Sequence, residues 1–592
     1  MQTIQQLLQL QINIALKSQN ISTEGVSLDA LRVVPTANAQ FGDYQWNGAL
    51  PLAKSLKTNP RALAQQIIEK LDVGEMSDAP EIAGAGFINF RLKTEWLEDF
   101  AVRVLNDARL GVPQTENART VVVDFSAPNV AKPLLVHHIR STVIGDAIQR
   151  LLRFVGHNVI TDNHIGDWGT QFGKVIIGWK NHLDEAALKQ DAVAEMGRLY
   201  KLVNEAAKSD AALEELAREE TLKLQNGDEE NLAIWNRLRE LSQLQFDDIY
   251  ARLNVRFDHA LGESFYNQRL NEVVEELKAK GIARESEGAV AVFSESDEPS
   301  KDDPFWKNQD GEWIPFPLLV QKSDGASLYG TTDLATIEYR EKMFSPDEIL
   351  YVVDARQSLH FRQVFATAQR WGFSSTRFEH IAFGTILGDD RKPLKTRSGD
   401  NVRLRDLLDE AESRALGIVQ DKNPDLDETT QREIARVVGI GAIKYADLSQ
   451  NRLSDYVFSW DKMLALQGNS APYLMYAYVR IRSILRKAEN EDVPFNRVLD
   501  SLTLEEKAEV ELVKYIARFP IAIGASLEDY RPNALCDYLF DLAQKFTTFY
   551  DACPVLKSEE PLRSSRLLLC DLTSRVLQQG LQLLGIETIE AM

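Results

Sequence analysis

Short apolar runs that alternate with helical patterns constrain the fold of this chain more than any other feature. The run VVVDF at 121–125 has the composition of a buried strand, and similar runs recur at 158–161, 349–353 and 381–383. An amphipathic helical pattern starting near Val136 follows the first run. This alternation predicts an α/β fold with a doubly wound parallel sheet, whose ligands lie beyond the carboxyl ends of the strands.

The chain is long enough for several domains. Its 592 residues exceed what one hydrophobic core supports, and a prior of about 150 residues per domain suggests about four units. A helical pattern over 51–71 and two Gly-rich turns predict a small α+β module at the N-terminus. The expected divisions are the module at 1–113, the sheet domain at 118–402 with a charge-rich helical insertion near 184–250, a helical connector at 403–455, and an all-helical domain at 456–592.

The net charge limits how the chain can bind RNA. Its 88 acidic and 67 basic residues give a formal charge of -21, which argues against nonspecific binding of nucleic acid over the whole surface. A local patch with Arg480, Arg482 and Arg486 on one helical pattern remains available for phosphates. Tyr44, close to Asn47, could stack on an RNA base or could pack its turn onto the module's own core.

The cysteines and the hydropathy pattern exclude other classes of protein. Cys536, Cys553 and Cys570 lie far apart without histidines at zinc-ligand spacing, so we expect buried free thiols in a reducing compartment and no structural zinc. No run of eighteen apolar residues occurs, and the N-terminus lacks the pattern of a signal peptide. A soluble cytoplasmic protein without a membrane partner is expected.

A polar segment follows the first predicted strand directly. Residues 124–133, DFSAPNVAKP, place acidic, hydroxyl, amide and cationic groups at the mouth of the sheet. A helix that starts near Val136 would aim free backbone N–H groups at the same place, which suits a nucleotide phosphate, with Lys132 and His138 as added cations or donors. A polar loop that merely caps a helix is the alternative.

Further polar groups follow the other predicted strands. The glycines of 163–173, among them Gly166, permit close approach of backbone to a ligand, whereas Trp168 fits a core position equally well. Asp333 stands at the start of a helical pattern, where it can favour the helix terminus and face a cationic substrate. Arg356, Gln357 and His360 follow 349–353 and could be capping or surface residues.

A basic loop at 389–399 completes the candidate groups. Its cations, which include Lys392, Lys395 and Arg397, could close on a triphosphate, although a solvated basic loop has the same composition. The chain contains no GxxxxGK[ST], HExxH or GxSxG, so common nucleotide and hydrolase signatures give no competing assignment.

Eight blocks of sequence resemble, in their order and approximate spacing, those of arginyl-tRNA synthetases. They are SAPNVAK, HHIRSTVIGD, NHIGDWGTQFG, LYGTTDLA, DARQ, KPLKTRSG, GAIKYADLS and APYLMYAYVRIRSILRKA, spread over 126–488. QFGDYQ, GAGFINF and the C-terminal GIETIEAM extend the resemblance over nearly the whole chain. The family belongs to class I. The resemblance therefore implies a Rossmann-type catalytic domain, an N-terminal module that contacts the tRNA elbow and a helical anticodon-binding domain, usually in a monomer.

The resemblance also implies site residues for arginine, ATP and tRNA. Those matched to the arginine site are Asp124, Ser126, Asn129, Tyr329, Asp333 and Gln357. Carboxylates suit this site because a planar guanidinium needs a fork of acceptors. Those matched to ATP are Pro128, Lys132, His138, Gly166, Lys392, Lys395 and Arg397, with catalytic roles for Lys132, His138 and Lys395. Contacts to tRNA are expected from Tyr44, Asn47, Arg480, Arg482 and Arg486.

The chain departs from the family at its first ATP signature. That signature, His-x-Gly-His, falls on Leu135-Val136-His137-His138, so two of its three defining residues are changed. The second signature, a lysine-rich loop, corresponds to 392–399, and a lysine at the position of Lys132 takes over part of its role in the family. The change leaves open a catalytically impaired paralogue that binds tRNA or ATP without efficient charging.

The implied reaction is ATP-dependent charging of tRNA(Arg) with L-arginine. The arginine carboxylate attacks the α-phosphorus of ATP, giving arginyl-adenylate and pyrophosphate, and the aminoacyl group then moves to the terminal ribose. Positioning and charge stabilisation would supply most of the catalysis, with Mg²⁺ on the phosphates. Family members generally need tRNA even for the first step. Another ATP-dependent ligase of the same fold would not need the C-terminal RNA-binding domain.

Overall fold

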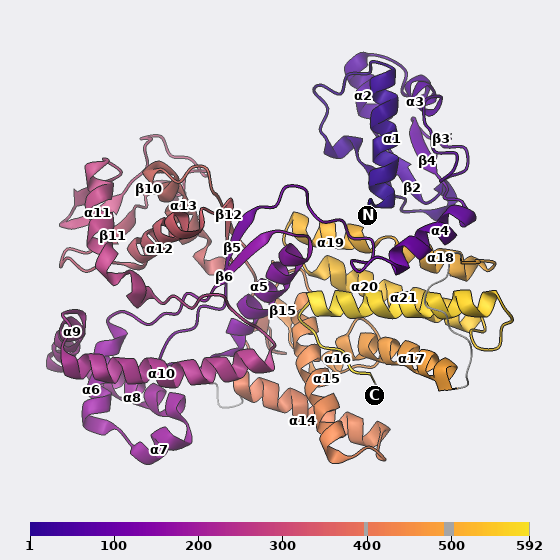
Figure 1. The fold of residues 1–592 in the computed structure, drawn as a ribbon. Coiled ribbons are helices and arrows are strands. Elements are labelled where there is room, and N and C mark those ends of the chain that lie inside the picture. The colour runs from indigo at the N-terminus through magenta and orange to yellow at the C-terminus, as the bar shows by residue number, and fades with distance from the viewer. Residues whose placement is uncertain (396–400, 491–501, 591–592) are drawn as a thin grey trace.

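A computed structural model describes residues 1–395, 401–490 and 502–590. The chain forms a central parallel sheet with a helical insertion on one side, a helical C-terminal region on the other, and a small N-terminal module above the C-terminal helices (Figure 1). No helix in these ranges is both long enough and apolar enough to cross a membrane.

The central sheet is four-stranded, parallel and covered on both faces. Its strands, in spatial order, are β13 (Arg377–His380), β12 (Glu348–Tyr351), β5 (Thr120–Asp124) and β6 (Asn158–Asp162). Val121 and Val123 face one hydrophobic cluster and Val122 faces the other, as expected for a strand buried on both sides. The predicted doubly wound parallel sheet is confirmed.

Helices pack on each face of this sheet. One face carries α5 (Val136–Phe154), which begins at the predicted residue, and the other carries α11 (Leu270–Ala279), α12 (Tyr329–Phe344) and α13 (Ser358–Trp371). The strand predicted at 381–383 is misplaced, since the edge strand β13 lies at 377–380. Its alternating polar residues lack the continuous apolar run that marks the inner strands.

A second, antiparallel sheet lies between α11 and α12 in the chain, and the apolar runs did not predict it. It consists of β7 (Ala283–Ser286), β8 (Ala289–Val292) and β11 (Leu318–Gln321), with a separate hairpin of β9 (Trp306–Gln309) and β10 (Glu312–Pro315). Each strand has four residues, and every residue of β10 is exposed. Strands of only four residues carry little periodic signal, whether they are apolar, as β8 is, or polar, as β9 is.

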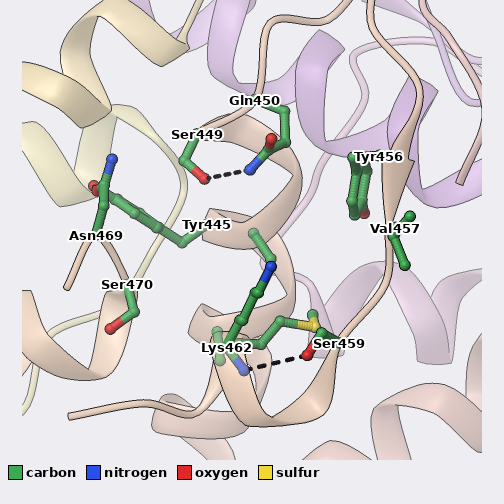
Figure 2. A pocket seen from close by; sticks show the side chains of 12 residues that line it. Tyr445, Ser449, Gln450, Tyr456, Val457, Ser459, Lys462, Asn469 and Ser470 are labelled. Atoms are coloured by element: carbon green, nitrogen blue, oxygen red, sulfur yellow. Dashed lines mark hydrogen bonds between the residues drawn. The ribbon is translucent and has the colours of Figure 1, made fainter. Parts of the chain in front are cut away.

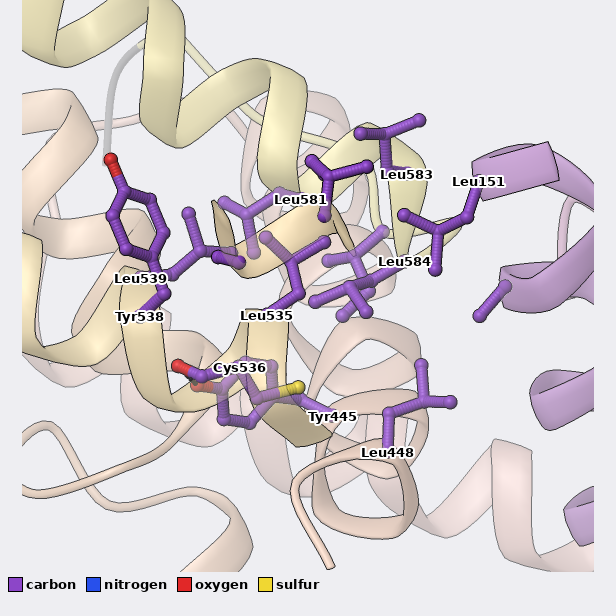
Figure 3. Packing of buried hydrophobic residues seen from close by; sticks show 14 of the residues in the cluster. Leu151, Tyr445, Leu448, Leu535, Cys536, Tyr538, Leu539, Leu581, Leu583 and Leu584 are labelled. Atoms are coloured by element: carbon purple, nitrogen blue, oxygen red, sulfur yellow. Dashed lines mark hydrogen bonds between the residues drawn. The ribbon is translucent and has the colours of Figure 1, made fainter. Parts of the chain in front are cut away.

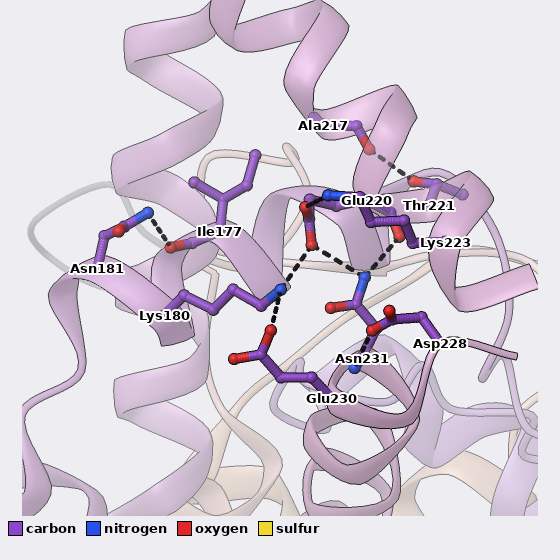
Figure 4. Close-up of polar contacts among 10 residues, drawn as sticks. All are labelled: Ile177, Lys180, Asn181, Ala217, Glu220, Thr221, Lys223, Asp228, Glu230 and Asn231. Atoms are coloured by element: carbon purple, nitrogen blue, oxygen red, sulfur yellow. Dashed lines mark hydrogen bonds and ion pairs between the residues drawn. The ribbon is translucent and has the colours of Figure 1, made fainter.

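The segment predicted as a helical insertion is a helical bundle. It contains α6 (Gln171–His182), α7 (Glu185–Gln190), α8 (Ala192–Ala207), α9 (Ala211–Gln225) and α10 (Glu229–Arg252). Figure 4 shows Glu220 of α9 joining three of these helices: its carboxylate accepts from Lys180 at 2.8 Å, Lys223 at 2.7 Å and Asn231 at 2.9 Å. Although burial opposes it, these hydrogen bonds lower the pKa of Glu220 to about 2.

The N-terminal module packs helices on an antiparallel sheet. Its elements are α1 (Ile4–Ser18), β1 (Val33–Pro35), β2 (Tyr44–Trp46), α2 (Ala49–Leu56), α3 (Pro60–Ile68), β3 (Glu81–Ala83), β4 (Phe87–Phe90) and, leading out of it, α4 (Thr94–Leu105). The single helix predicted over 51–71 is two helices. Lys57 adopts a left-handed conformation, and Asn59 caps a new helix that begins with Pro60.

The C-terminal region is helical and shares a core with the sheet domain. After the short strand β14 (Ile386–Leu387) come α14 (Leu404–Lys422), α15 (Glu428–Leu448), β15 (Tyr456–Val457), α16 (Trp460–Met463), α17 (Ala471–Asn490), α18 (Lys507–Ile516), α19 (Phe519–Glu528), α20 (Asn533–Ala552) and α21 (Leu562–Leu583). Figure 3 shows Leu584, just after α21, and Leu535 of α20 packing near Leu151 of α5. Cys536, Cys553 and Cys570 are all buried in this region.

Candidate active site

The carboxyl ends of the inner strands meet at one edge of the sheet. Asp124 ends β5 and pairs in register with Asp162 at the end of β6 and with Tyr351 at the end of β12. The polar segments at 125–133, 163–173 and 354–357 begin just beyond these residues. The structure therefore brings together the segments that the sequence places after separate strands.

The loops after β5 and β6 are joined through Gly166. Its amide donates to the Pro128 carbonyl at 2.9 Å, and its carbonyl accepts from Val130 at 3.0 Å. A β-carbon on residue 166 would lie 2.5 Å from Oδ1 of Asn129, so this contact requires glycine. The predicted residues Pro128, Asn129 and Gly166 thus form one continuous wall of the mouth.

The carboxylate of Asp124 is paired with a guanidinium of the chain itself. Arg340 of α12, fully buried, donates to Asp124 at 2.6 Å and to Asp162 at 2.8 Å. Burial opposes the charge of Arg340, but these two carboxylates raise its pKa above the usual value. Asp124 is only 4% exposed. In this structure Asp124 neutralises Arg340, and its contact with the arginine substrate stays a prediction.

Ser126 is also an internal residue. Its buried hydroxyl lies 2.8 Å from the hydroxyl of Thr142 and 2.8 Å from that of Tyr250. Its backbone is in the left-handed region, with φ of 76°, and its amide donates to Ser141 at 2.8 Å. These bonds hold a strained loop in place, and the predicted contact of Ser126 with arginine stays a prediction.

Carboxylates form the acidic side of the mouth. Glu263 opens a 3-10 turn at Glu263–Arg269, and burial together with the charges of Asp333 and Asp167 raises its pKa to about 7, against a smaller lowering by His164. Tyr329 lies close enough for the charge of Glu263 to raise the pKa of its phenol as well, in addition to burial. Glu263 was not predictable from the sequence, because the segment LGES at 261–264 follows no predicted strand and carries no periodic pattern.

Asp333 joins α12 to α13. Its Oδ2 lies 2.5 Å from Nε2 of His360, and this pairing outweighs burial and raises the pKa of the imidazole. Asp333 is the fifth residue of α12 and lies outside its first turn, so the predicted role at the helix terminus is wrong. Tyr329 is 72% exposed and Gln357 is also exposed, which leaves both side chains available to a ligand.

The altered signature lies at the start of α5. The amide of Leu135 donates to Nδ1 of His138 at 2.9 Å, and the Leu135 carbonyl lies 3.2 Å from the same nitrogen; the shorter contact fits a neutral ring that carries its proton on Nε2. Burial, aided by the neighbouring His137, lowers the pKa of His138 to about 3. His138 is therefore a neutral donor and does not supply the predicted cation. His137 is exposed, with its ring centroid 4.1 Å from that of His138.

The backbone at this helix start is partly occupied. The amide of Val136 donates to the Val402 carbonyl at 3.0 Å, and that of His138 donates to the Leu135 carbonyl at 2.9 Å. The expectation that the helix aims a set of free N–H groups at a phosphate is therefore corrected for these two amides. Side chains must supply a larger share of any phosphate contact.

The predicted lysines differ in their surroundings. Lys132 is half-buried, and its ammonium lies 5.4 Å from the ring centroid of Tyr200 on α8; burial lowers its pKa. Lys392 and Lys395 are exposed on the loop after β14, where isolated bridges join 387 to 393 and 395 to 401. Arg397 lies outside the described residues.

The two N-terminal residues predicted to contact RNA, Tyr44 and Asn47, are both at least partly buried. Tyr44 is only 2% exposed, and the adjacent Asp43 pairs with Lys514 of α18 at 2.9 Å. Packing, the alternative to base stacking, is what the structure shows for Tyr44. Asn47 is partly buried, and its Oδ1 has no hydrogen-bond partner within the described ranges.

The arginines of α17 already have partners in the chain. Arg480 lies over the ring of Tyr550 at 4.6 Å, while Arg482 contacts the Glu590 carboxylate at 2.9 Å and Arg486 donates to its carbonyl at 2.7 Å. The shared contact confirms that Arg482 and Arg486 lie on one face of the helix. RNA must compete with Glu590 for them.

One cavity lies apart from the mouth. Figure 2 shows a cavity of about 160 Å³ between α15 and α16, lined by Tyr445, Lys462 and Asn469 among others and by none of the predicted site residues. Within the described ranges, no three His, Cys, Asp or Glu side chains are grouped so that they could hold a metal ion.

Comparison with known proteins covers nearly the whole chain. Family models described as Arginyl tRNA synthetase N terminal domain, tRNA synthetases class I (R), catalytic domain, and DALR anticodon binding domain match residues 3–92, 101–460 and 474–592. Curated proteins named arginine–tRNA ligase are 44% identical in Hahella chejuensis, over 100% of both chains, and 46% identical in Nostoc punctiforme, over 95% of both. Solved arginyl-tRNA synthetases of Plasmodium falciparum (29% identity) and Thermus thermophilus (26%) cover 100% of both chains, with TM-scores of 0.82 and 0.81.

Proposed function

Because the chain belongs to the arginyl-tRNA synthetase family, we propose that it uses ATP to join L-arginine to tRNA(Arg), with release of AMP and pyrophosphate. Curated relatives named arginine–tRNA ligase share 43% to 46% identity with it, and they give no support to a catalytically impaired paralogue. The catalytic fold, the N-terminal module and the DALR domain are all present in one chain.

The acidic side of the mouth is the observation that carries this proposal. The guanidinium of the substrate lies between Asp333 and ionised Glu263, and the exposed Tyr329 borders it. Two carboxylates match the fork of N–H donors better than one does. His360 holds the Asp333 carboxylate at 2.5 Å and so fixes its orientation. Asn129 and Gln357 supply polar contacts to the α-amino and carboxyl end.

Two lysines and one neutral imidazole contact the phosphates of ATP. As the arginine carboxylate attacks the α-phosphorus, His138 donates from Nε2, while Lys132 and Lys395 balance the negative charge of the departing pyrophosphate. The terminal ribose hydroxyl of tRNA then attacks the acyl carbon of the adenylate, and AMP leaves. Mg²⁺, which the resemblance implies, would be held chiefly by the ATP phosphates, because the described residues provide no cage of their own.

The experiment is aminoacylation with ATP, radiolabelled arginine and tRNA(Arg). We expect charging, and we expect Asp333→Asn to raise KM for arginine about tenfold or more with little change in KM for ATP, since a hydrogen bond to a charged group contributes about 1.5 to 3 kcal/mol. Asp421→Asn, an exposed change near the end of α14, serves as the control. Equal losses for both substrates would mean that Asp333 is structural. A monomeric protein located in the cytoplasm is also proposed, which size-exclusion chromatography and fractionation would test.

A further inference from the structure

A groove rich in arginine lies far from the predicted active site. It has a volume of about 760 Å³ and is bordered by Arg109, by Arg150 and Arg153 of α5, and by Arg256. We call it the arginine groove. Gln579 and Gln582 of α21 line its other side, so the segment after the N-terminal module, the sheet domain and the C-terminal helices all contribute. Helix α5 has 19 residues, so its end at the groove lies about 28 Å from its start at the ATP signature.

The arginines of the groove have N–H groups that donate to no described residue. Arg153 donates to Gln149 at 2.8 Å and to Asp258 at 2.6 Å, and Arg109 donates to the carbonyls of Val112 and Phe154. Each guanidinium carries five N–H groups, so these bonds leave several free. Arg256 is exposed, and its side chain has no hydrogen bond or ion pair to any other described residue.

The charge balance of the groove is opposite to that of the chain. Of its four arginines, Arg150 pairs with Asp146 and Arg153 pairs with Asp258, which leaves Arg109 and Arg256 as an excess of positive charge, whereas the whole protein carries a formal charge of -21. A cationic patch on an acidic protein directs anions to one place and keeps them off the rest of the surface. Planar guanidiniums with adjacent amide donors suit phosphate oxygens in particular.

We propose that the arginine groove binds the phosphate backbone of RNA, as a second contact of the tRNA substrate outside the active-site mouth. The open volume spans three parts of the chain, which suits an extended backbone better than a single small anion. This inference deepens the proposed function and rests on it only for the identity of the RNA.

The test is equilibrium binding of tRNA(Arg) at several salt concentrations, without ATP or arginine. Each lost phosphate contact lowers the slope of log affinity against log salt by about 0.9. We expect that decrease for Arg256→Gln, about twice that decrease for Arg153→Gln with Arg256→Gln, and no decrease for Arg256→Lys, which keeps the charge. The control is Arg432→Gln, which removes an exposed arginine outside the groove.

The outcomes separate this inference from the proposed function. Because Arg256 has no described partner, Arg256→Gln should keep the melting temperature of the unaltered protein, so a loss of affinity cannot be attributed to unfolding. An unchanged slope in both groove variants overturns the inference even if charging is normal. A changed slope supports it even if charging fails. If calorimetry shows that the variants lose binding of inorganic tripolyphosphate while the slope for tRNA stays the same, the groove serves free phosphates and the RNA assignment is wrong.

Discussion

Single residues at the mouth acquire their chemistry from burial. The same loss of solvent that raises the pKa of Glu263 to about 7 lowers that of His138 to about 3 and also lowers that of Lys132. His138 is consequently neutral at every pH at which the protein would be studied, and Glu263 changes charge near neutrality. Glu263 can therefore make arginine binding depend on pH between about 6 and 8.

Glu263 should control that dependence. In the free protein its pKa is raised from 4.5 to about 7, so its stabilising contribution is present below pH 4.5 and is lost as the pH rises through 7. Binding of cationic arginine needs the ionised form, so KM for arginine should fall by up to about tenfold from pH 6 to pH 8. Glu263→Gln should give a high KM that does not change over this range, with KM for ATP unaffected. A variant that keeps the pH dependence would assign it to another group.

The two altered signature positions make a second prediction. The imidazole of His137 occupies a place where the family has a bare glycine, and Leu135 lacks a donor that would meet phosphate charge. We expect Leu135→His with His137→Gly to raise the turnover number by about tenfold, equivalent to about 1.4 kcal/mol of barrier, with KM for arginine nearly unchanged. Steady-state pyrophosphate exchange measures both quantities. Slower exchange in the double variant would show that the native pair is the better arrangement.

At the scale of elements, helices and strands with a periodic apolar pattern were predictable, and features without such a pattern were not. The starts of α5 and α12, the three strands β5, β6 and β12, and the mouth at their carboxyl ends follow from apolar runs and from the residues after them. The break between α2 and α3 depends on one left-handed residue and a new cap. Apolar periodicity alone does not record such a break.

The same limit applied to the site. Asn129 and Gly166 could be placed because both follow strands. The pairing of Asp124 with Arg340 could not, since the partner is more than two hundred positions away and looks like any helical arginine. The role of Glu263 could not be predicted for the same reason, because its raised pKa depends on burial and on the charges of Asp333 and Asp167. Long-range charge pairing depends on packing, which one sequence does not display.

Lys444 illustrates how one buried side chain joins several elements. From α15 its ammonium donates to the Leu253 carbonyl after α10 at 2.6 Å and to the Gly585 carbonyl after α21 at 2.7 Å, and it lies 3.5 Å from Asp146 of α5. We expect Lys444→Met to lower the free energy of unfolding by about 2 kcal/mol or more, because these buried acceptors lose their partner. Urea unfolding measures the change. Lys422→Met, at the exposed end of α14, is the matched control, and equal midpoints in the two variants would contradict the assignment.

At the scale of the whole molecule, the sheet domain and the C-terminal helices are not independent. Leu151 of α5 and Leu584 after α21 belong to one hydrophobic cluster, and Tyr530 donates to the buried Glu348 at the start of β12 at 2.7 Å. Removing the C-terminal helices would expose the inner side of α5 to water. The boundary near 456 therefore separates sequence patterns more clearly than it separates folding units.

A chain that stops at residue 455 should consequently fail as an enzyme fragment. We expect it to bind a hydrophobic dye, to lose cooperative thermal unfolding and to lose pyrophosphate exchange along with tRNA binding, because the core it needs is incomplete. Circular dichroism and dye fluorescence on the fragment and on the full chain measure this. A soluble fragment that melts cooperatively and binds ATP would show that the sheet domain is self-sufficient.

Helix α5 connects the ATP signature to the arginine groove. The ATP signature lies at its start, and its last turn borders the arginine groove. Between these ends, its apolar residues pack in the hydrophobic cluster that includes α21. A straight helix in a close-packed core transmits a displacement along its length more readily than it bends. RNA bound in the arginine groove, as proposed above, would therefore act on the same helix that carries the ATP signature at its other end.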